Sequence, residues 1–368
     1  MSAAKSVSVV LAGCGRPLRS MGWYHAVQIL DGRVPNATLK YVVEPWYLSN
    51  AAKDSPGYEE FHDWRKIQET KGISFSATVE EVPQRGHEEL RLGIISARTS
   101  DNPKLLDGCL NIGCKTIFLE KPGAPTVKEL EEMRNKAASA GAEVFMGFNK
   151  NVSSYLTRSR EFVAKHDGKC DIMFVHNNNY ENSETELAEC FERNAEGMLK
   201  NMAIHELALL VTYYGVTVDN IAKVEADKDF SSRKTLKGPS SGKEFTDFDK
   251  LKFKIVTKAG AEVNLAADRC GGDDSVGIVA DAGTGAELAR FSMPDEETIA
   301  NIPNLKAAYG DAMPYFFAQD PDYVKLKELV VQHMLTRSQA TGVATIDTAV
   351  ETLKIAEYLT PILQEQLT

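Results

Sequence analysis

Lys121 is the first side chain in the sequence placed where chemistry could occur. It lies in Glu120-Lys121-Pro122, directly after TIFL, a run typical of a buried strand. Ligands of open α/β sheets bind at the carboxyl ends of strands, and a lysine ammonium there can polarise a substrate hydroxyl or stabilise a developing alkoxide. A Lys-Pro bond can also be cis at low cost. A surface turn is the alternative reading of this tripeptide.

His205 is the second candidate, on the predicted helix GMLKNMAIHELALLVTYYG. That helix would place Asn201 and His205 four residues apart, and therefore on one face. Histidine titrates near neutral pH, so it can take a proton from an alcohol and return it. The Asn201 amide cannot exchange a proton and could only orient a substrate or His205. A purely structural histidine remains the alternative.

Glycines follow the first predicted strand, VSVVLAG. They are Gly13 and Gly15, with Gly22 seven residues later at the start of a helical pattern. Such glycines let the backbone turn tightly and approach a pyrophosphate, which then lies on the helix N-terminus. In the usual dinucleotide motif the third glycine follows the second by three residues, whereas in this chain the gap is seven. The motif is therefore incomplete. Arg16 in the enlarged loop could neutralise a phosphate.

Glu44 ends the second predicted strand, LKYVVE, 22 residues after Gly22. An acidic residue near this spacing accepts hydrogen bonds from the adenine ribose hydroxyls. Its charge repels a 2′-phosphate and so favours NAD over NADP. Arg16 or Arg19 could still neutralise that phosphate, so NADP stays an alternative. A solvated turn residue before Pro45 is the alternative.

The elements around these residues alternate in type. From Val7 to Phe148, short apolar runs alternate with helical patterns, as in a doubly wound parallel sheet. Gly113 and Gly141 stand where helices should end, and Thr126 where one should begin. We therefore expect a Rossmann domain over residues 1–149.

The pattern changes after residue 149. Two hairpins are predicted in the second half, turning near Ala259-Gly260 and near Gly283 and Gly285, and two amphipathic helices follow. The polar segment 231–250 is expected to be an exposed loop. Residues 150–368 are thus predicted to form an α+β substrate domain with a large, open, mainly antiparallel sheet.

Composition narrows the function classes. The 368 residues carry a formal net charge of −10, which disfavours nucleic acid or an anionic membrane as partner. Six cysteines without CxxC spacing, and an N-terminal apolar run too short for a signal peptide, favour a reducing, cytoplasmic location. We find no metal-ligand spacing and no nucleophile triad, so no metal is expected.

Taken in order, these features resemble the Gfo/Idh/MocA family, named for glucose-fructose oxidoreductase, inositol dehydrogenase and a rhizopine-catabolism protein. The matching motifs are His25-Ala26 on the first helix, Glu120-Lys121-Pro122, and Asn201-Met202-Ala203-Ile204-His205 where the family has Asp-x-x-x-His. The stretch SARTSDNPKLLDGCLNIGCKTIFLEKPGAPTVKELEEM looks like the family segment that leads through the EKP lysine. Three departures are the enlarged glycine loop, Asn201 in place of an acid, and SARTSDNPK where the family often has Thr-Pro-Asn and then a histidine.

The resemblance implies an NAD(P)-dependent oxidoreductase acting on a hydroxyl-bearing carbon of a sugar, cyclitol or related polyol. Lys121 would polarise the hydroxyl, His205 would be the general acid/base, and Asn201 would complete the catalytic set. The expected cofactor-binding residues are Gly13, Gly15, Arg16, Gly22, Glu44, Ser96, Ala97, Glu120, Lys121 and Pro122. The expected substrate-binding residues are Lys121, Asn149, Lys150, Asn177, Asn201 and His205.

Two other functions stay open, because one fold hosts several reactions. An imine or opine-type reductase could use Arg98 and Lys150 to bind a carboxylate. A nucleotide-sensing protein without turnover would fit Asn201 and the altered loop. In each case the partner is a small molecule, and the open sheet face predicts a homodimer or homotetramer.

Overall fold

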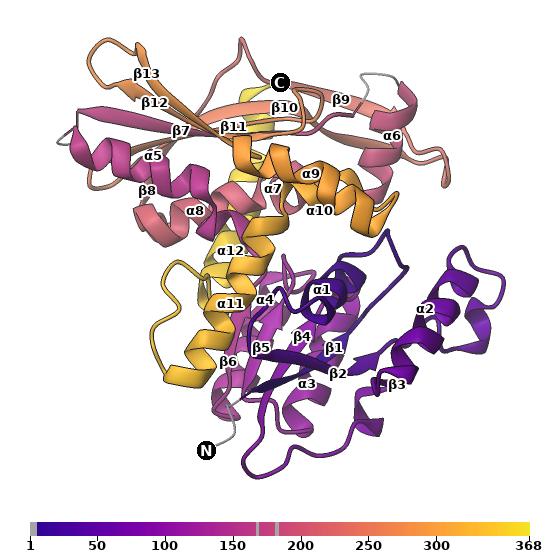
Figure 1. Ribbon diagram of the computed structural model, residues 1–368. Helices are drawn as coiled ribbons and strands as arrows, with labels where there is room; N and C mark the ends of the chain where they lie inside the picture. The colour runs from indigo at the N-terminus through magenta and orange to yellow at the C-terminus, as the bar shows by residue number, and fades with distance from the viewer. Residues whose placement is uncertain (1–5, 167–168, 181–183) are drawn as a thin grey trace. The chain divides into compact units, whose positions relative to one another are not determined.

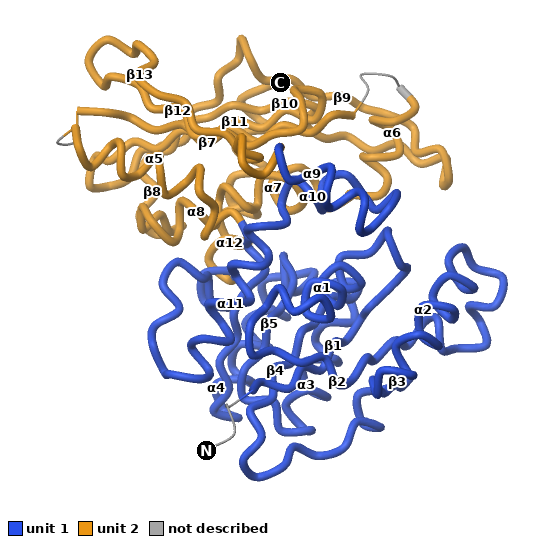
Figure 2. Tube along the Cα trace, in the orientation of Figure 1, with its two compact units in different colours: residues 1–149, 300–349 blue, residues 150–299, 350–368 orange. Residues whose placement is uncertain are grey.

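The computed structural model describes residues 6–166, 169–180 and 184–368, which form two compact units. Unit 1 comprises Met1–Asn149 and Ala300–Ala349, and unit 2 comprises Lys150–Ile299 and Val350–Thr368 (Figure 2). The sequence prediction had placed everything after residue 149 in the second domain. The segment Ala300–Ala349 instead groups with unit 1, because its helices pack on the parallel sheet.

Unit 1 is built on a parallel sheet with the strand order β3-β2-β1-β4-β5-β6 (Figure 1). This is the order of dinucleotide-binding folds, so the predicted Rossmann architecture is confirmed. The strands are β1 (Val7–Ala12), β2 (Ala37–Val43), β3 (Ser74–Ser76), β4 (Leu90–Ile95), β5 (Thr116–Leu119) and β6 (Glu143–Met146).

Helices connect and cover these strands. They are α1 (Met21–Leu30), α2 (Tyr58–Thr70), α3 (Asn102–Asn111), α4 (Val127–Ser139), α10 (Pro314–Ala318) and α11 (Asp320–Thr336). The Thr126 hydroxyl caps α4 by accepting from the Glu129 N–H at 3.2 Å, and Gly113 and Gly141 follow their helices with φ of 90° and 62°. Helix α11 packs on β1 and β4, so a segment distant in sequence from these strands is part of unit 1.

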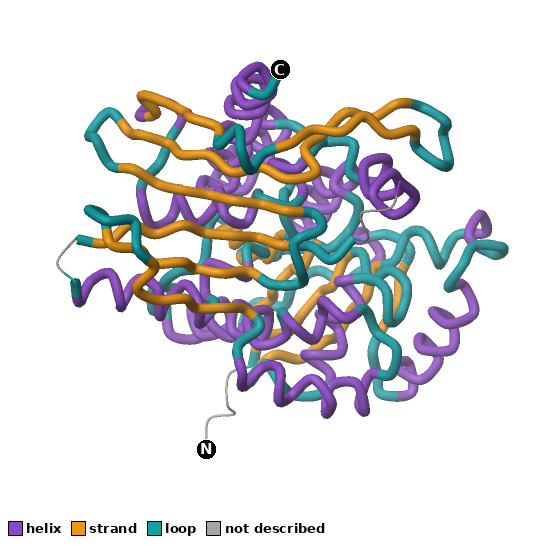
Figure 3. The backbone as a smooth tube through the Cα atoms, turned by 90° about the horizontal axis from the view of Figure 1, so that it is seen from above, coloured by secondary structure: helices purple, strands orange, loops and turns teal. Residues whose placement is uncertain are grey.

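Unit 2 contains a sheet with the order β13-β12-β7-β11-β10-β8, to which β9 adds by pairing with β10 (Figure 3). Neighbouring strands run antiparallel except β7 and β11, as predicted for a mainly antiparallel sheet. The strands are β7 (Cys170–Asn177), β8 (Ile221–Ala226), β9 (Ser232–Lys237), β10 (Glu244–Thr257), β11 (Glu262–Asp268), β12 (Ser275–Asp281) and β13 (Glu287–Met293). The two predicted hairpins are β10–β11 and β12–β13.

The expectation of a loop over 231–250 was wrong. The segment is a hairpin in which β9 pairs with the first half of β10, and Thr235 and Thr246 share a hydrogen bond of 2.8 Å across it. This ribbon is largely solvated, so it lacks the apolar alternation that marks a half-buried strand. Backbone pairing and polar cross-strand contacts therefore define it.

The remaining helices are α5 (Ser154–Lys165), α6 (Glu184–Arg193), α7 (Met198–Asn201), α8 (Ile204–Tyr214), α9 (Glu296–Tyr309) and α12 (Ile346–Gln366). Short 3₁₀ helices cover Asn50–Ala52, Val79–Glu81, Thr99–Asp101, Asn149–Val152 and Val218–Asn220. No helix within the described residues is long and apolar enough to cross a membrane.

The single helix predicted around His205 is two helices. A turn at residues 202–203 separates α7 from α8, and the Ala203 N–H reaches back five residues to the Met198 carbonyl at 3.0 Å. This wider turn interrupts the regular helical spacing. The argument that Asn201 and His205 share a face of one helix therefore does not hold.

Candidate active site

The predicted cofactor residues of unit 1 gather at one edge of its sheet. They follow β1, β2, β4 and β5, and these strands are parallel, so all of their carboxyl ends lie at that edge. The strand order reverses direction between β1 and β4. In open α/β sheets, ligands bind at the carboxyl edge beside such a reversal.

The glycine loop is tightly packed despite its length. Gly13 has φ of 85°, and a Cβ on it would lie 2.7 Å from the backbone of Ala97. A Cβ on Gly22 would lie 1.9 Å from the Gly13 carbonyl oxygen. Gly22 thus permits the close packing of helix on strand that the third glycine of the motif provides. It does so although it follows Gly15 by seven residues.

Glu44 anchors the glycine loop. Its carboxylate accepts from the N–H groups of Gly15 at 2.6 Å, Trp46 at 3.1 Å and Tyr47 at 3.4 Å. Burial raises the pKa of Glu44, and these N–H groups oppose the rise. The Cys14 N–H also faces this carboxylate, so the backbone holds Glu44 at the end of β2, where a dinucleotide fold places the acid that contacts the adenine ribose.

The start of α1 fits a bound anion. Ser20 is the N-cap residue, but its hydroxyl accepts from the Arg16 N–H at 2.9 Å rather than from the helix. No acidic residue occupies the first turn of α1. The first N–H groups of the helix therefore lack a capping side chain, which is the arrangement that receives a pyrophosphate. Arg16 adds a positive charge nearby, although its guanidinium pairs with Glu60 at 2.8 Å.

Lys121 follows β5 and is half-buried, and its bond to Pro122 is cis. The neighbouring Glu120 is held from two sides. Its carboxylate lies 2.9 Å from Nε2 of His25, and a Cβ on Gly147 would meet it at 2.5 Å. The segments His25-Ala26 and Glu120-Lys121-Pro122, which carry the resemblance in sequence, are therefore joined by a direct contact.

A buried basic pair lies behind Glu120. Nδ1 of His25 is 3.0 Å from Nζ of Lys327 on α11, and both side chains are almost fully buried. Burial, together with the Lys327 charge, lowers the pKa of His25 to about 4. Burial also lowers the pKa of Lys327 to about 7, against the opposing effect of Glu120. The imidazole is thus neutral near pH 7, with Nε2–H donating to Glu120 and Nδ1 accepting from Lys327.

The network continues along α1. Lys327 donates to Gln28 at 2.7 Å, and Gln28 donates to the Asp320 carboxylate at 2.8 Å. Asp320 also accepts from Tyr24 and from both terminal nitrogens of Arg33. This chain of polar contacts fixes α11 against α1, and with them the position of Glu120.

Unit 2 contains a second polar cluster around Glu206, the residue after His205. Its carboxylate contacts Nζ of Lys150 at 2.5 Å and Nδ1 of His176 at 3.0 Å. The rings of His176 and His205 lie edge to face, with centroids 6.3 Å apart. Lys150 and Glu206 are almost fully buried, whereas His176 and His205 retain 9% and 6% exposure. The two histidines thus lie beside a buried ion pair and are themselves nearly buried.

Glu206 is ionised in this cluster. Burial alone would raise its pKa, but His176 and Lys150 together lower the pKa to about 2. A carboxylate only accepts hydrogen bonds, so Nδ1 of His176 must be the donor.

The predicted asparagines have different surroundings. Asn177 alternates with His176 along β7, so its side chain points to the opposite face of the sheet and donates to Asp274 at 2.8 Å. Asn201 donates to Glu196 at 3.1 Å. Asn149 belongs to unit 1, where it is buried and donates to Gln319 at 3.3 Å. The structure thus brings Lys150 together with the His205 cluster and leaves Asn177 on the other face.

Sequence reasoning missed two charged residues, Lys327 and Glu206, and its predicted site residues included Asn177 but not the neighbouring His176. Lys327 occupies an apolar-face position of α11, since Tyr323, Leu326, Val330 and Val331 are buried around it at helical spacing. Glu206 stands in the apolar run IHELALL. A charged residue within an apolar pattern is a usable signal, because charges are rarely buried without partners.

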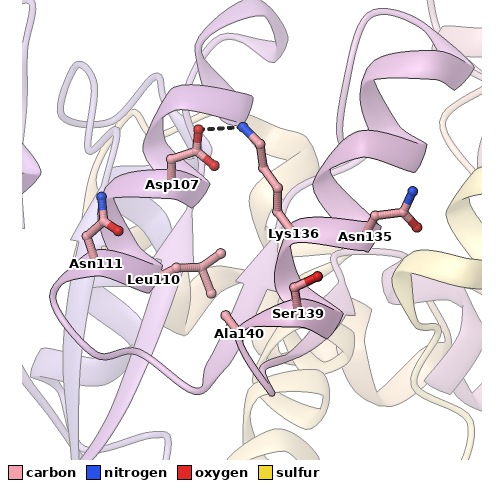
Figure 4. Close-up of a pocket in the computed structure, with 7 residues that line it drawn as sticks. All are labelled: Asp107, Leu110, Asn111, Asn135, Lys136, Ser139 and Ala140. Carbon is pink, nitrogen blue, oxygen red and sulfur yellow. Dashed lines mark hydrogen bonds and ion pairs between the residues drawn. The ribbon is translucent and has the colours of Figure 1, made fainter.

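A separate groove lies between α3 and α4 of unit 1, lined by Asp107, Leu110, Asn111, Asn135, Lys136, Ser139 and Ala140 (Figure 4). Lys136 and Asp107 pair across it at 2.6 Å. The lining lies toward the C-terminal ends of both helices, hence near the amino edge of the strands, away from the carboxyl edge. Among the described residues, no three or more His, Cys, Asp or Glu side chains are arranged to hold a metal ion.

Comparison with protein-family models and with curated protein sequences finds no match. Solved structures match over nearly the whole chain. Myo-inositol dehydrogenase from Corynebacterium glutamicum is 16% identical with a TM-score of 0.68, covering 98% of this chain and 97% of that one. The chain has the fold of the inositol dehydrogenases. Scyllo-inositol dehydrogenase from Lactobacillus casei with bound NAD(H) and scyllo-inositol is 15% identical with a TM-score of 0.66, covering 98% and 97%. Myo-inositol 2-dehydrogenase from Lactobacillus plantarum is 16% identical with a TM-score of 0.65, covering 99% and 97%.

Proposed function

We propose that this protein is an NAD(P)-dependent dehydrogenase acting on a hydroxyl-bearing carbon of a sugar, cyclitol or related polyol. The observation that carries the proposal is the packing of Gly22 on Gly13 beside an uncapped start of α1. It supports a dinucleotide site in a loop whose spacing alone is irregular. The inositol dehydrogenase fold points to polyols as the substrate class.

The cofactor assignment rests on the carboxyl edge of the unit 1 sheet. Gly13, Gly15 and Gly22 would shape the loop, the start of α1 would bind the pyrophosphate, and Glu44 would accept from the adenine ribose. The cofactor, when bound, supplies the hydride acceptor or donor. NAD is favoured over NADP because a carboxylate at Glu44 would repel a 2′-phosphate.

The catalytic assignment uses two residues, Lys121 and His205. Lys121 polarises the hydroxyl and stabilises the developing alkoxide, and His205 takes the hydroxyl proton. Glu120, held by His25, fixes the strand end that carries Lys121. Lys150 is almost fully buried and pairs with Glu206, so we propose that it shapes the His205 surroundings rather than binding substrate itself.

The test is turnover of a polyol, sugar and inositol panel with NAD and with NADP. Wild type is compared with Lys121→Met, which keeps the side-chain length without the charge, and with His205→Asn. Lys71→Met, an exposed lysine after α2, is the matched control. We expect both site variants to lose about a hundredfold or more in kcat, with the affinity for NADH retained and the control unchanged.

Other outcomes separate the remaining functions. Acceptance of amino-acid imines in place of polyols would identify an imine or opine-type reductase. Tight NADH binding without turnover of any compound would identify a nucleotide sensor, which the amide at Asn201 also fits. Absence of NADH and NADPH binding would overturn the cofactor site.

We also propose a homodimer or homotetramer that covers the open face of the unit 2 sheet. Light scattering at micromolar concentration tests this, and a monodisperse monomer would contradict it.

A further inference from the structure

We propose that Lys327 is a positioning residue for the dehydrogenase reaction. Through His25 it holds the Glu120 carboxylate, and with that carboxylate the turn that carries Lys121. The proposal rests on the proposed function for its effect on turnover, but the contact between Lys327 and His25 is testable without turnover. All of these residues belong to unit 1.

The turn Lys121-Pro122 is held by side chains on both sides. On the side of β5, the Glu120 carboxylate lies 2.9 Å from Nε2 of His25. On the other side, the Gly123 carbonyl accepts from Nδ2 of Asn102 at 3.0 Å, and Asn102 is almost fully buried. The position of Lys121 therefore depends on two contacts, one through Glu120 and one through Asn102.

Lys327 determines how His25 contacts Glu120. Its Nζ lies 3.0 Å from Nδ1 of His25, and it also donates to Gln28 at 2.7 Å. An ammonium only donates hydrogen bonds, so Nδ1 is the acceptor and the ring proton is on Nε2, where it donates to Glu120. The buried imidazole also lies edge to face against Tyr323, with ring centroids 5.4 Å apart. These contacts hold the ring in the orientation that serves Glu120.

Lys327 also supplies a positive charge to this buried cluster. The charged or titratable groups around it are Glu120 after β5, His25 on α1, Arg33 in the loop after α1, and Asp320 and Tyr323 on α11. Burial lowers the pKa of Lys327 to about 7, against the opposing effects of Glu120 and Asp320. The ammonium that balances the Glu120 carboxylate is therefore present below pH 7 and is lost above it. The support that Lys327 gives to the turn should depend on pH in the same way.

The first experiment follows His25 by nitrogen NMR of histidine-labelled full-length protein from pH 5 to pH 9, with its signals assigned by their loss in His25→Gln. We expect a neutral ring with its proton on Nε2, and an Nδ1 signal that shifts with a midpoint near pH 7 as the ammonium becomes an amine. The shift should vanish in Lys327→Met and persist in Lys325→Met, an exposed lysine of the same helix. A proton on Nδ1, or an Nδ1 signal that does not respond to pH, would overturn the proposal.

The second experiment measures kcat for the best polyol of the panel from pH 6 to pH 9. The ratio of wild-type to variant kcat removes the pH dependence of groups that both proteins share. For Lys327→Met we expect a ratio of about tenfold or more at pH 6 that falls toward pH 9, with KM changed less than kcat. Asn102→Ala loosens the same turn through an uncharged contact, so its ratio should not vary with pH. Lys325→Met should behave as wild type.

A second variant guards against misfolding of Lys327→Met. The amide of Lys327→Gln can donate to Nδ1 of His25 but carries no charge, so its kcat ratio should also fall from pH 6 to pH 9. A folded state of either variant is enough for the comparison.

The outcomes separate this proposal from the proposed function. Wild-type turnover with a Lys327→Met ratio that is the same at every pH would overturn the positioning role alone, because a purely structural lysine predicts that result. A ratio near one would also overturn it. If wild type lacks turnover altogether, the proposed function fails, and the positioning role fails with it, whatever the spectrum of His25 shows.

Discussion

Gly22 opens helix α1 directly against the carbonyl oxygen of Gly13, with no space for a side chain between them. We predict that Gly22→Ala destabilises unit 1 by about 1–3 kcal/mol or more, because the added methyl must displace backbone. NADH affinity should fall at least tenfold, since the loop and the start of α1 move apart. Urea unfolding and fluorescence titration measure the two effects. Gly86→Ala is the matched control, because its Cβ would find the nearest atom at 3.8 Å.

Lys327 should make the free energy of unfolding depend on pH above neutrality. Its pKa is about 7 in the folded protein against an ordinary 10.5, so the unfolded chain binds more protons between these values. Stability should therefore rise with pH through this window, the burial of Lys327 being most costly below pH 7. Lys327→Met should flatten this rise, as measured by urea midpoints across the window. An unchanged slope in Lys327→Met would show that Lys327 titrates normally.

The contributions of Glu206 and Lys150 to the free energy of unfolding should be coupled. Glu206→Gln leaves the buried Lys150 charge without its partner and should cost roughly 3–5 kcal/mol at pH 7. Adding Lys150→Met to that variant should recover much of the loss. A double-mutant cycle by urea unfolding measures the coupling, and simple additivity would contradict it.

The same pair should make the protein acid-sensitive. The folded pKa of Glu206, about 2, lies below its ordinary 4.5, so its contribution is complete above pH 4.5 and is lost as pH falls toward 2. His25, with a folded pKa of about 4 against 6.5, adds a loss of stability as pH falls from 6.5 to 4. Thermal unfolding from pH 7 down to pH 3 should show a falling midpoint across both windows. A constant midpoint below pH 6.5 would contradict these environments.

Glu44 should set both loop order and cofactor preference. Glu44→Ala removes the acceptor of the Gly15 N–H and the charge that opposes a 2′-phosphate. We expect NADH affinity to fall about tenfold or more and the preference for NADH over NADPH to shrink. Parallel titrations with both nucleotides test this. A variant that keeps the wild-type preference would place the discrimination elsewhere.

The fold was predictable where local pattern and burial agree. The strands of unit 1 are short apolar runs that alternate with helical patterns, and that alternation indicates a parallel sheet. The β9–β10 ribbon was missed because its solvated faces carry no apolar alternation. The segment Ala300–Ala349 was assigned to the wrong unit, because the sequence shows that its helices are amphipathic but not which sheet they cover.

The candidate site also contains residues that the sequence could predict and residues that it could not. Lys121, Gly22 and His205 stand in motifs that sequence alone can flag. His176 and Glu206 gain meaning only when β7 and α8 come together, since 30 residues separate them in sequence. Asn177 was a predicted substrate-binding residue and His176 was not, and the alternation of a strand places the two on opposite faces.

The most direct test of the central claim follows the hydrogen itself. Purified protein is incubated with NAD and an inositol deuterated at its ring carbons, and the reduced cofactor is analysed by mass spectrometry. The account predicts deuterated NADH with wild type and none above background with Lys121→Met. Bound NAD that stays unlabelled across the whole deuterated polyol panel would contradict the dehydrogenase assignment.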